Sequence, residues 1–216
     1  MINFIDDNIL NYSISKSEKE SKLLNDLYRE TYLKVLNPRM ISGHYQGRIL
    51  SFISKIMRPK KILEIGTYTG YSAICLCEGL DNDGVLHTID NNKELIEIQN
   101  KYFKKANLTN KIVQHSGDAK NILPSLDEEF NIVFIDADKE SYPEYYDLII
   151  NKVSSGGIII ADNIFEAVDL HEPRAQVIDV DVNLLPDQNT VRISVTFEVL
   201  SVGETVTLDL NLARLR

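Results

Sequence analysis

The sequence contains no tryptophan, only two cysteines, and no apolar run long enough to cross a bilayer. It also has no basic surplus, because 23 Lys and Arg stand against 32 Asp and Glu and give a net charge of −9. Nucleic acids and anionic membrane surfaces attract positive charge, so an acidic chain is poorly suited to bind either. The first twenty residues are acidic and polar, unlike a signal peptide. We therefore expect a cytoplasmic protein that binds neither nucleic acid nor membrane.

Several common catalytic motifs are also missing. The sequence has no Gly-x-Ser-x-Gly and no Walker-type Gly-Lys-Ser/Thr, which removes support for hydrolases and for nucleotide-phosphate enzymes. The four histidines show no metal-ligand spacing among themselves. Cys75 and Cys77 lie two apart in a predicted helix, so their side chains diverge and favour reduced core residues over a disulfide or a metal pair.

What the sequence does contain is a regular alternation of helical and strand patterns. Helical patterns cover residues 18–36 and 49–56, and more follow between the predicted strands. The predicted strands are short apolar runs at 61–65, 85–89, 111–113, 131–135 and 157–160. Strands that alternate with helices indicate a parallel sheet with crossover connections. We therefore predict an α/β fold, a Rossmann-like doubly wound parallel sheet, over residues 1–163.

The last part of the chain has a different pattern. Apolar and polar residues alternate over 191–199 and 205–212, and more weakly over 177–182. This period of two is typical of half-buried antiparallel strands. We predict that residues 164–216 form an antiparallel β-rich tail, which either closes the parallel sheet or is a separate appendage.

The sharpest local signal is the segment ILEIGTYTGYS at residues 62–72. A buried strand ends near Glu64, and Gly66 and Gly70 permit a tight turn into a helix that begins near Tyr71. Such a turn brings backbone N–H groups close to a ligand, and an acid at the strand tip suits a ligand with an ammonium group. The Gly-x-x-x-Gly spacing differs from the dinucleotide fingerprint. A turn with only a structural role is an equally good interpretation of the glycines alone.

The next two strands also end in polar residues. Asp90 stands where an acid accepts hydrogen bonds from ribose hydroxyls, although it could instead cap the following helix. Together with the glycine turn, ribose binding is the better interpretation. Asp118 and Ala119 follow the third strand, where an adenine ring could lie along the backbone. An ordinary loop turn is the stronger alternative there.

The fourth and fifth strands lead into Asp136 and into Asp162 and Asn163. If these strands are neighbours, two carboxylates and one amide oxygen meet, and these are hard ligands suited to Mg²⁺. Lys139 is then a candidate base, because a nearby cation lowers the pKa of an ammonium group. Helix capping explains any single acid better, but three ligands on two strand ends favour a metal site.

As a set, these segments resemble the cation-dependent class I S-adenosylmethionine O-methyltransferases, the catechol and caffeoyl-CoA O-methyltransferase group, over roughly residues 20–163. The segment NPRMISGHYQGRIL at 37–50 is similar to the entry segment of that family, and FIDADK and IIIADN are similar to its metal motifs. The resemblance implies cofactor roles for Met40, Ser42, Glu64, Gly66, Tyr68, Ser72, Asp90, Asp118, Ala119 and Asp136. It further implies Mg²⁺ ligands at Asp136, Asp162 and Asn163, and catalysis by Lys139 and Asp136.

Past Asn163 the family pattern is not recognisable. Residues 170–216 are weakly similar instead to the carboxyl end of phage baseplate wedge proteins with a lysozyme-like fold. We therefore expect a methyltransferase that moves a methyl group to a small catechol-like hydroxyl acceptor, and the resemblance is compatible with a homodimer. The alternatives are a catalytically silent assembly protein whose tail strands pair with a partner, and a nicotinamide-dependent dehydrogenase, which the glycine spacing disfavours.

Overall fold

The computed structural model describes residues 7–161, 175–185, 190–199 and 204–213 and divides the chain into two units. The first unit covers Met1–Ile160 and the second covers Ala161–Arg216. Side-chain surroundings are defined for residues 11–161.

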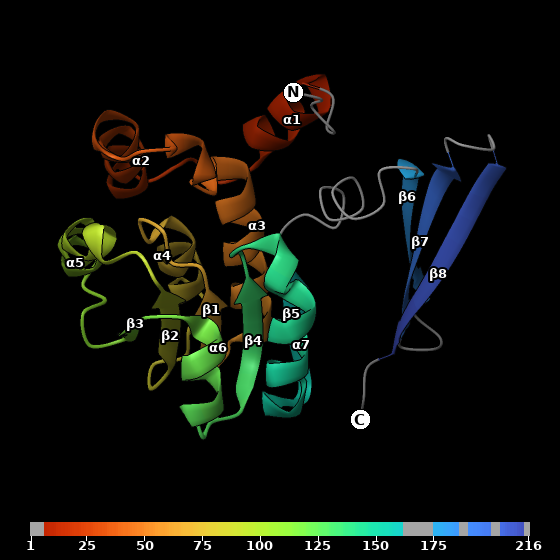
Figure 1. The fold of residues 1–216 in the computed structure, drawn as a ribbon. Coiled ribbons are helices and arrows are strands. Elements are labelled where there is room, and N and C mark those ends of the chain that lie inside the picture. Colours follow the sequence, from red (N-terminus) through yellow and green to blue (C-terminus); the bar gives the residue numbers. More distant parts are fainter. Residues whose placement is uncertain (1–6, 162–174, 186–189, 200–203, 214–216) are drawn as a thin grey trace. The chain divides into compact units, whose positions relative to one another are not determined.

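The first unit is built on a five-stranded sheet with the order β3-β2-β1-β4-β5 (Figure 1). The strands are β1 (Lys61–Ile65), β2 (Val85–Asp90), β3 (Ile112–Ser116), β4 (Phe130–Ile135) and β5 (Val153–Ala161). β1 pairs in parallel with β2 on one side and with β4 on the other, and β2 pairs in parallel with β3. The prediction of a parallel sheet with intervening helices is confirmed. The strand order reverses between β1 and β4, which is where ligands bind in open α/β sheets.

Seven α-helices lie within the described part of the first unit. They are α1 (Asp7–Lys16), α2 (Lys22–Lys34), α3 (Gly43–Met57), α4 (Tyr71–Cys77), α5 (Ile96–Lys105), α6 (Ala119–Ile122) and α7 (Tyr142–Ile149). Short 3₁₀ turns lie at η1 (Pro38–Met40), η2 (Lys93–Leu95), η3 (Leu123–Ser125), η4 (Lys139–Ser141) and η5 (Ile150–Lys152). Among the described residues, no helix has both the length and the apolar character that a bilayer span requires.

The first two predicted helices differ from the observed ones at their ends. The helix predicted over 18–36 begins only at Lys22, because the Ser21 side chain caps it by accepting a hydrogen bond from the Leu24 N–H. It ends at Lys34, because Val35 is already extended with a φ of −108°. The predicted helix at 49–56 is the second half of α3, which begins at Gly43.

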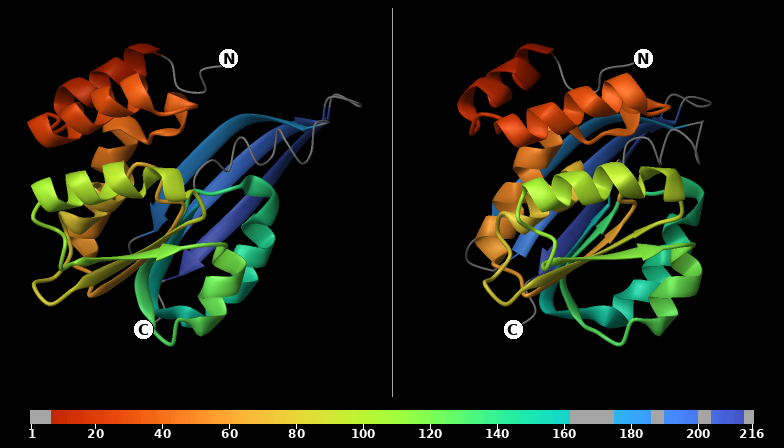
Figure 2. Two further views of the ribbon diagram at one scale, coloured as in Figure 1. Left: turned by 60° about the vertical axis from the view of Figure 1, so that its left-hand side comes forward. Right: turned by 90° about the vertical axis from the view of Figure 1, so that its left-hand side faces the viewer.

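Alternate residues of the central strands face two separate hydrophobic clusters. Ile62 of β1 and Phe134 of β4 belong to the cluster that also contains buried residues of α2 to α5. Leu63 and Ile65 belong to the cluster formed with α6 and α7. Helices therefore cover both faces of the sheet (Figures 1 and 2), which explains why the central strands β1 and β4 are mostly buried and apolar.

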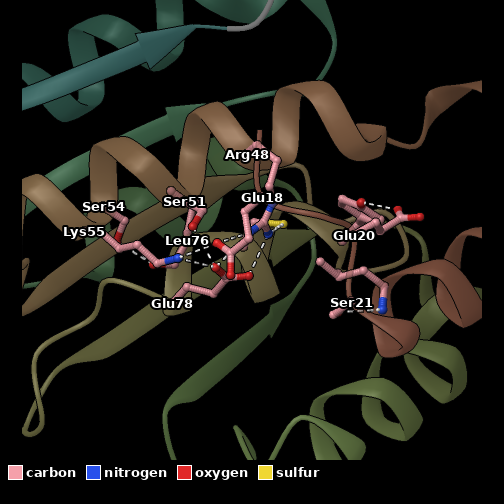
Figure 3. A network of polar contacts seen from close by, with 12 residues as sticks. Glu18, Glu20, Ser21, Arg48, Ser51, Ser54, Lys55, Leu76 and Glu78 are labelled. Carbon is pink, nitrogen blue, oxygen red and sulfur yellow. Dashed lines mark hydrogen bonds and ion pairs between the residues drawn. The ribbon is translucent and has the colours of Figure 1, made fainter. Parts of the chain in front are cut away.

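A polar network fastens α3 to α4 outside these clusters (Figure 3). The Arg48 guanidinium lies 2.7 Å from one carboxylate oxygen of Glu78, and the Lys55 ammonium lies 2.9 Å from the other. Glu18, in the segment between α1 and α2, pairs with both cations. Burial alone would raise the pKa of Glu78, but hydrogen bonds from Arg48, Ser51 and Lys55 lower it to about 2. Glu78 is therefore ionised at neutral pH and joins three segments of the chain.

The second unit contains three antiparallel strands in the order β6-β7-β8. They are β6 (Ala175–Leu185), β7 (Thr190–Val199) and β8 (Glu204–Ala213). Val195 of β7 lies opposite Val180 of β6 and Leu208 of β8. The pairing register of β6 with β7 shifts between Val177 and Asp179.

Candidate functional site

The turn between β1 and α4, residues 66–70, lies at the point where the strand order reverses; we call it the cofactor turn. Gly66 has a φ of 101°, and a side chain there would overlap the backbone carbonyl of Asp136. Gly70 has a φ of 89°, precedes α4, and approaches the Phe103 ring so closely that a Cβ would lie 2.6 Å from it. Both glycines are therefore required by conformation and by space. The helix predicted near Tyr71 begins at that residue.

Asp90 bonds directly to this turn. The backbone N–H of Tyr68 donates to Asp90 Oδ2 over 2.6 Å, and the N–H of Asn92 donates to Oδ1 over 2.8 Å. The following helical turn is capped by Asn92 through the Glu94 N–H, so the capping role considered for Asp90 is wrong. The Tyr68 hydroxyl also donates to the carbonyls of Leu36 and Asn37, at 3.3 and 3.2 Å. Tyr68 thus links the end of β2 to the segment before η1.

Glu64 is a fully buried carboxylate on β1. It lies opposite Thr88 of β2 and accepts a hydrogen bond of 2.6 Å from the Thr88 hydroxyl at Oε2. Its other oxygen, Oε1, is buried without a hydrogen-bond partner among the described residues. Burial raises the pKa of Glu64 to about 7, against the opposing effect of polar contacts with Ser72 and Thr88. Such a group stabilises a cation that reaches Oε1.

The structure also describes four other predicted cofactor residues. Met40 ends η1 with 64% of its surface exposed, and Ser42 directly precedes α3. Asp118 accepts a hydrogen bond from the Lys120 N–H and caps α6, and Ala119 is buried in the cluster on that face of the sheet. The loop that carries Asp118 is held near β2, because the Gly117 N–H donates to the Asp90 carbonyl.

The predicted metal residues are only partly described. Asp136 directly follows β4, and its N–H donates to the Ile65 carbonyl at the end of β1. Two tyrosines of α7 bond the same loop, since Tyr142 donates to the Ile135 carbonyl and Tyr145 to Asp138 Oδ1. Lys139 begins η4.

Asp162 and Asn163, the other predicted ligands, lie outside the described residues. Their strand β5 is the neighbour of β4, as the prediction requires. Within residues that the structure describes, no group of three or more His, Cys, Asp or Glu side chains is arranged to hold a metal. The metal set thus stays a prediction.

A small pocket opens beside the cofactor turn, between α5 and the ends of β2 and β3. The residues that line it are Thr67, Asp90, Asn92, Ile96, Gln99, Gln114, His115 and Ser116. Of these, only Asp90 was predicted. Gln99 is 2% exposed although it is polar, and a polar residue on the buried face of an amphipathic helix was the signal that could have identified it.

A family model described as O-methyltransferase matches residues 13–212 of the chain. A putative caffeoyl-CoA O-methyltransferase of Arabidopsis thaliana is 34% identical over 88% of this chain and 86% of its own length. The catechol O-methyltransferase of Niastella koreensis is 36% identical over 55% of this chain and 56% of its own.

Solved structures give the same picture. A Podospora anserina methyltransferase with bound S-adenosylhomocysteine (SAH) has a TM-score of 0.71 at 27% identity, over 83% of this chain and 90% of its own. The O-methyltransferase TomG of Streptomyces achromogenes, in complex with S-adenosylmethionine (SAM), has a TM-score of 0.70 at 25% identity, over 93% and 94%.

These matches correct two expectations about the last part of the chain. The family model continues to residue 212, so the expectation that the resemblance ends at Asn163 is wrong. The similarity of residues 170–216 to phage baseplate wedge proteins is not borne out.

Proposed function

Since the chain belongs to the O-methyltransferase family and is an SAM-dependent enzyme, we propose that it methylates a hydroxyl of a small, catechol-like acceptor with the help of a divalent cation. The acceptor class follows from relatives named caffeoyl-CoA and catechol O-methyltransferases. The cation follows from the oxygen ligands that Asp136 offers after β4 and that Asp162 and Asn163 offer after β5 in the chain.

One observation carries the cofactor assignment: the unpartnered, buried Oε1 of Glu64 at the end of β1. SAM carries an ammonium group on its methionine part, and an ammonium group is the partner that such an oxygen needs. The cofactor turn starts two residues later, with backbone too close to Asp136 for any side chain at Gly66. In the proposal, Glu64, Gly66, Tyr68 and Ser72 hold the methionine part.

The remaining cofactor contacts extend along the strand ends. Each carboxylate oxygen of Asp90 accepts one backbone hydrogen bond, and each can accept another from a ribose hydroxyl. Asp118 and Ala119 are proposed to lie against the adenine, and Met40 and Ser42 are proposed to face the cofactor and the acceptor.

For the cation, the proposal uses Asp136, Asp162 and Asn163. Asp136 follows β4 directly, and β5 ends at Ala161, one residue before Asp162 in the chain. Two carboxylates and an amide oxygen are hard ligands, which suits Mg²⁺. When bound, the cation makes a coordinated hydroxyl more acidic.

The reaction then needs little more than alignment from the protein. The neutral amine of Lys139 accepts the proton of the acceptor hydroxyl and becomes an ammonium group. The acceptor oxygen forms a bond to the methyl carbon of SAM while the carbon–sulfur bond breaks, which leaves SAH. Opposite charges cancel in this step, so holding the two reactants in line is the main contribution of the site.

Calorimetric titration with SAM, followed by transfer of a labelled methyl group to catechol with and without EDTA, tests the proposal. We expect binding of SAM and transfer that requires the cation. A folded sample that binds no SAM would overturn the proposal. Transfer that continues fully in EDTA would remove the cation from it.

A further inference from the structure

The cofactor turn contains a strained residue that is held from three directions. Tyr68 has a φ of 49°, a left-handed conformation that is unfavourable for a residue with a bulky side chain. Its N–H is bonded to Asp90 and its hydroxyl to the carbonyls of Leu36 and Asn37. A strained conformation persists only where the surroundings fix it. The third direction, toward α5, has no role in the function proposed above.

From α5, the side chain of Gln99 bonds to the remaining backbone group of Tyr68. Gln99 Nε2 donates to the Tyr68 carbonyl over 2.7 Å. The orientation of the amide is fixed because a carbonyl can only accept, and because Gln99 Oε1 accepts 2.7 Å away from Gln114 Nε2 on β3. Both ends of the Gln99 amide are therefore used.

Burial of the Gln99 amide costs free energy, because the amide loses its hydrogen bonds to water. Only 2% of the residue is exposed, and the other buried residues of α5 include Tyr102 and Phe103. An apolar side chain could occupy such a position without the desolvation cost of an amide. The amide differs from an apolar side chain because it donates a hydrogen bond to the Tyr68 carbonyl. The N–H of Tyr68 in turn orients the Asp90 carboxylate.

We infer that Gln99 is a positioning residue for cofactor binding, which fixes the Tyr68 peptide and thereby the Asp90 carboxylate. The inference rests on the proposed function, since Asp90 is the proposed ribose ligand. Gln114 supports it from β3 by holding the Gln99 amide. Gln99 touches no reacting atom, so its effect falls on SAM affinity and not on acceptor binding.

The main test is Gln99→Met, which keeps an unbranched side chain of similar length but has no donor for the Tyr68 carbonyl. We expect the Kd for SAM to rise about tenfold, the effect of one unmatched buried hydrogen bond. At saturating SAM, the KM for the acceptor should stay within about twofold of the wild-type value, because one lost contact to the turn leaves the acceptor site in place. An unchanged Kd for SAM in Gln99→Met would overturn the inference.

A matched control separates this effect from a general loosening of α5. Tyr102 lies on the same helix, is 1% exposed, and donates one hydrogen bond to Glu30 of α2. Tyr102→Phe removes that bond without touching the cofactor turn. We expect a lower Tm and an unchanged Kd for SAM. An equal loss of affinity in Tyr102→Phe would overturn the inference, since the effect would then belong to the helix.

Two further variants keep the inference testable if Gln99→Met folds poorly. In Gln99→Glu, the neutral acid can donate to the Tyr68 carbonyl and the carboxylate cannot, so affinity relative to the wild type should fall as pH rises. The variant is compared with the wild type at each pH because two titratable residues present in both proteins, Asp90 and His115, line the same pocket. Gln114→Leu, on the exposed edge strand, should weaken SAM binding about two- to threefold, because the amide of Gln99 loses one support.

A ratio of Gln99→Glu to wild-type affinity that is flat with pH would count against the inference. Absence of SAM binding by the wild-type chain is a different outcome, which overturns the proposed function and this inference with it.

Discussion

The carboxylate of Glu64 and the hydroxyl of Thr88, directly opposite each other on β1 and β2, are joined by a hydrogen bond of 2.6 Å. The Thr88 oxygen also lies 2.5 Å from the hydroxyl of Thr67 in the cofactor turn. A buried polar chain therefore runs from the turn to an acid whose pKa is raised by burial to about 7. The protonation of that acid is linked to whatever binds at its free oxygen.

The first prediction concerns this linkage. Only ionised Glu64 pairs with an ammonium group. As the pH falls below about 7, SAM affinity should therefore decrease, and the decrease should approach tenfold for each pH unit. Glu64→Gln should bind weakly and lose this pH dependence. The raised pKa of Glu64 also affects the stability of the protein without SAM. Because this pKa lies above the ordinary value of 4.5, the contribution of Glu64 to stability is complete below pH 4.5 and is lost as pH rises through 7. Titration calorimetry and thermal melts over this range check both effects, and a wild-type affinity flat with pH would contradict the pairing.

The second prediction concerns Asp90, which holds the turn and is the proposed ribose ligand. Asp90→Ala should weaken SAM binding by about 1–3 kcal/mol, because the N–H groups of Tyr68 and Asn92 lose their acceptor. Asp90→Asn keeps one acceptor oxygen and should weaken binding less. An unchanged dissociation constant in Asp90→Ala would remove the residue from the site.

A pair of glycine substitutions tests the close approach in the turn. Gly66 and Gly156 both have left-handed φ values, 101° and 77°, but only Gly66 faces backbone, since nothing lies within 4 Å of a Cβ at Gly156. Gly156→Ala should cost about 1 kcal/mol of stability from strain alone. Gly66→Ala should cost about 3 kcal/mol and prevent SAM binding. Equal melting temperatures for the two variants would show that the overlap with Asp136 is relieved cheaply.

Metal removal provides the fourth prediction. EDTA should abolish transfer to catechol and leave SAM binding largely intact, because the proposed contacts to the methionine part and the ribose do not use the cation. Asp162→Ala should reproduce the effect of EDTA when methyl transfer and calorimetric binding are measured in parallel. A variant that remains fully active would exclude Asp162 as a ligand.

The fifth prediction concerns acid stability. Hydrogen bonds from Arg48, Ser51 and Lys55 outweigh burial and hold the pKa of Glu78 at about 2. A depressed pKa stabilises the fold above the ordinary value of 4.5, and that contribution is lost as pH falls toward 2. Glu78→Gln should lower the free energy of unfolding at pH 7 by about 2 kcal/mol and reduce its decline in acid. Urea unfolding at pH 7 and pH 3 measures both, and equal losses at the two pH values would contradict the assignment.

The sheet and the cofactor turn could be predicted because their signals are local. Apolar runs marked β1, β2 and β4, the start of β3 and the end of β5, and the two glycines marked the turn into α4. The start of α3 at Gly43 was missed because its apolar pattern begins later, and α1 was missed because its sequence is mostly polar. Whether residues 164–216 close the parallel sheet stays a prediction.

The supporting residues of the site were harder to predict. Gln99 is a polar residue on the buried face of α5, but only the fold brings its amide to the Tyr68 carbonyl. Asp90 could be identified as a ligand candidate from its place after β2, but its bond to the turn depends on a left-handed residue at position 68. Contacts between segments distant in sequence are thus the part that local pattern does not specify.

The two thiols of α4 provide a means to watch the core open. Cys75 and Cys77 are free and buried, and burial raises the pKa of Cys75 to about 12 and raises that of Cys77 as well. The reactive thiolate is therefore rarely populated in the folded protein. An alkylating reagent reacts only when α4 separates from the sheet. The alkylation rate in native buffer then reports how often this helix detaches. Slower labelling on addition of a ligand would measure, without any enzyme assay, how firmly that ligand holds the helix in place.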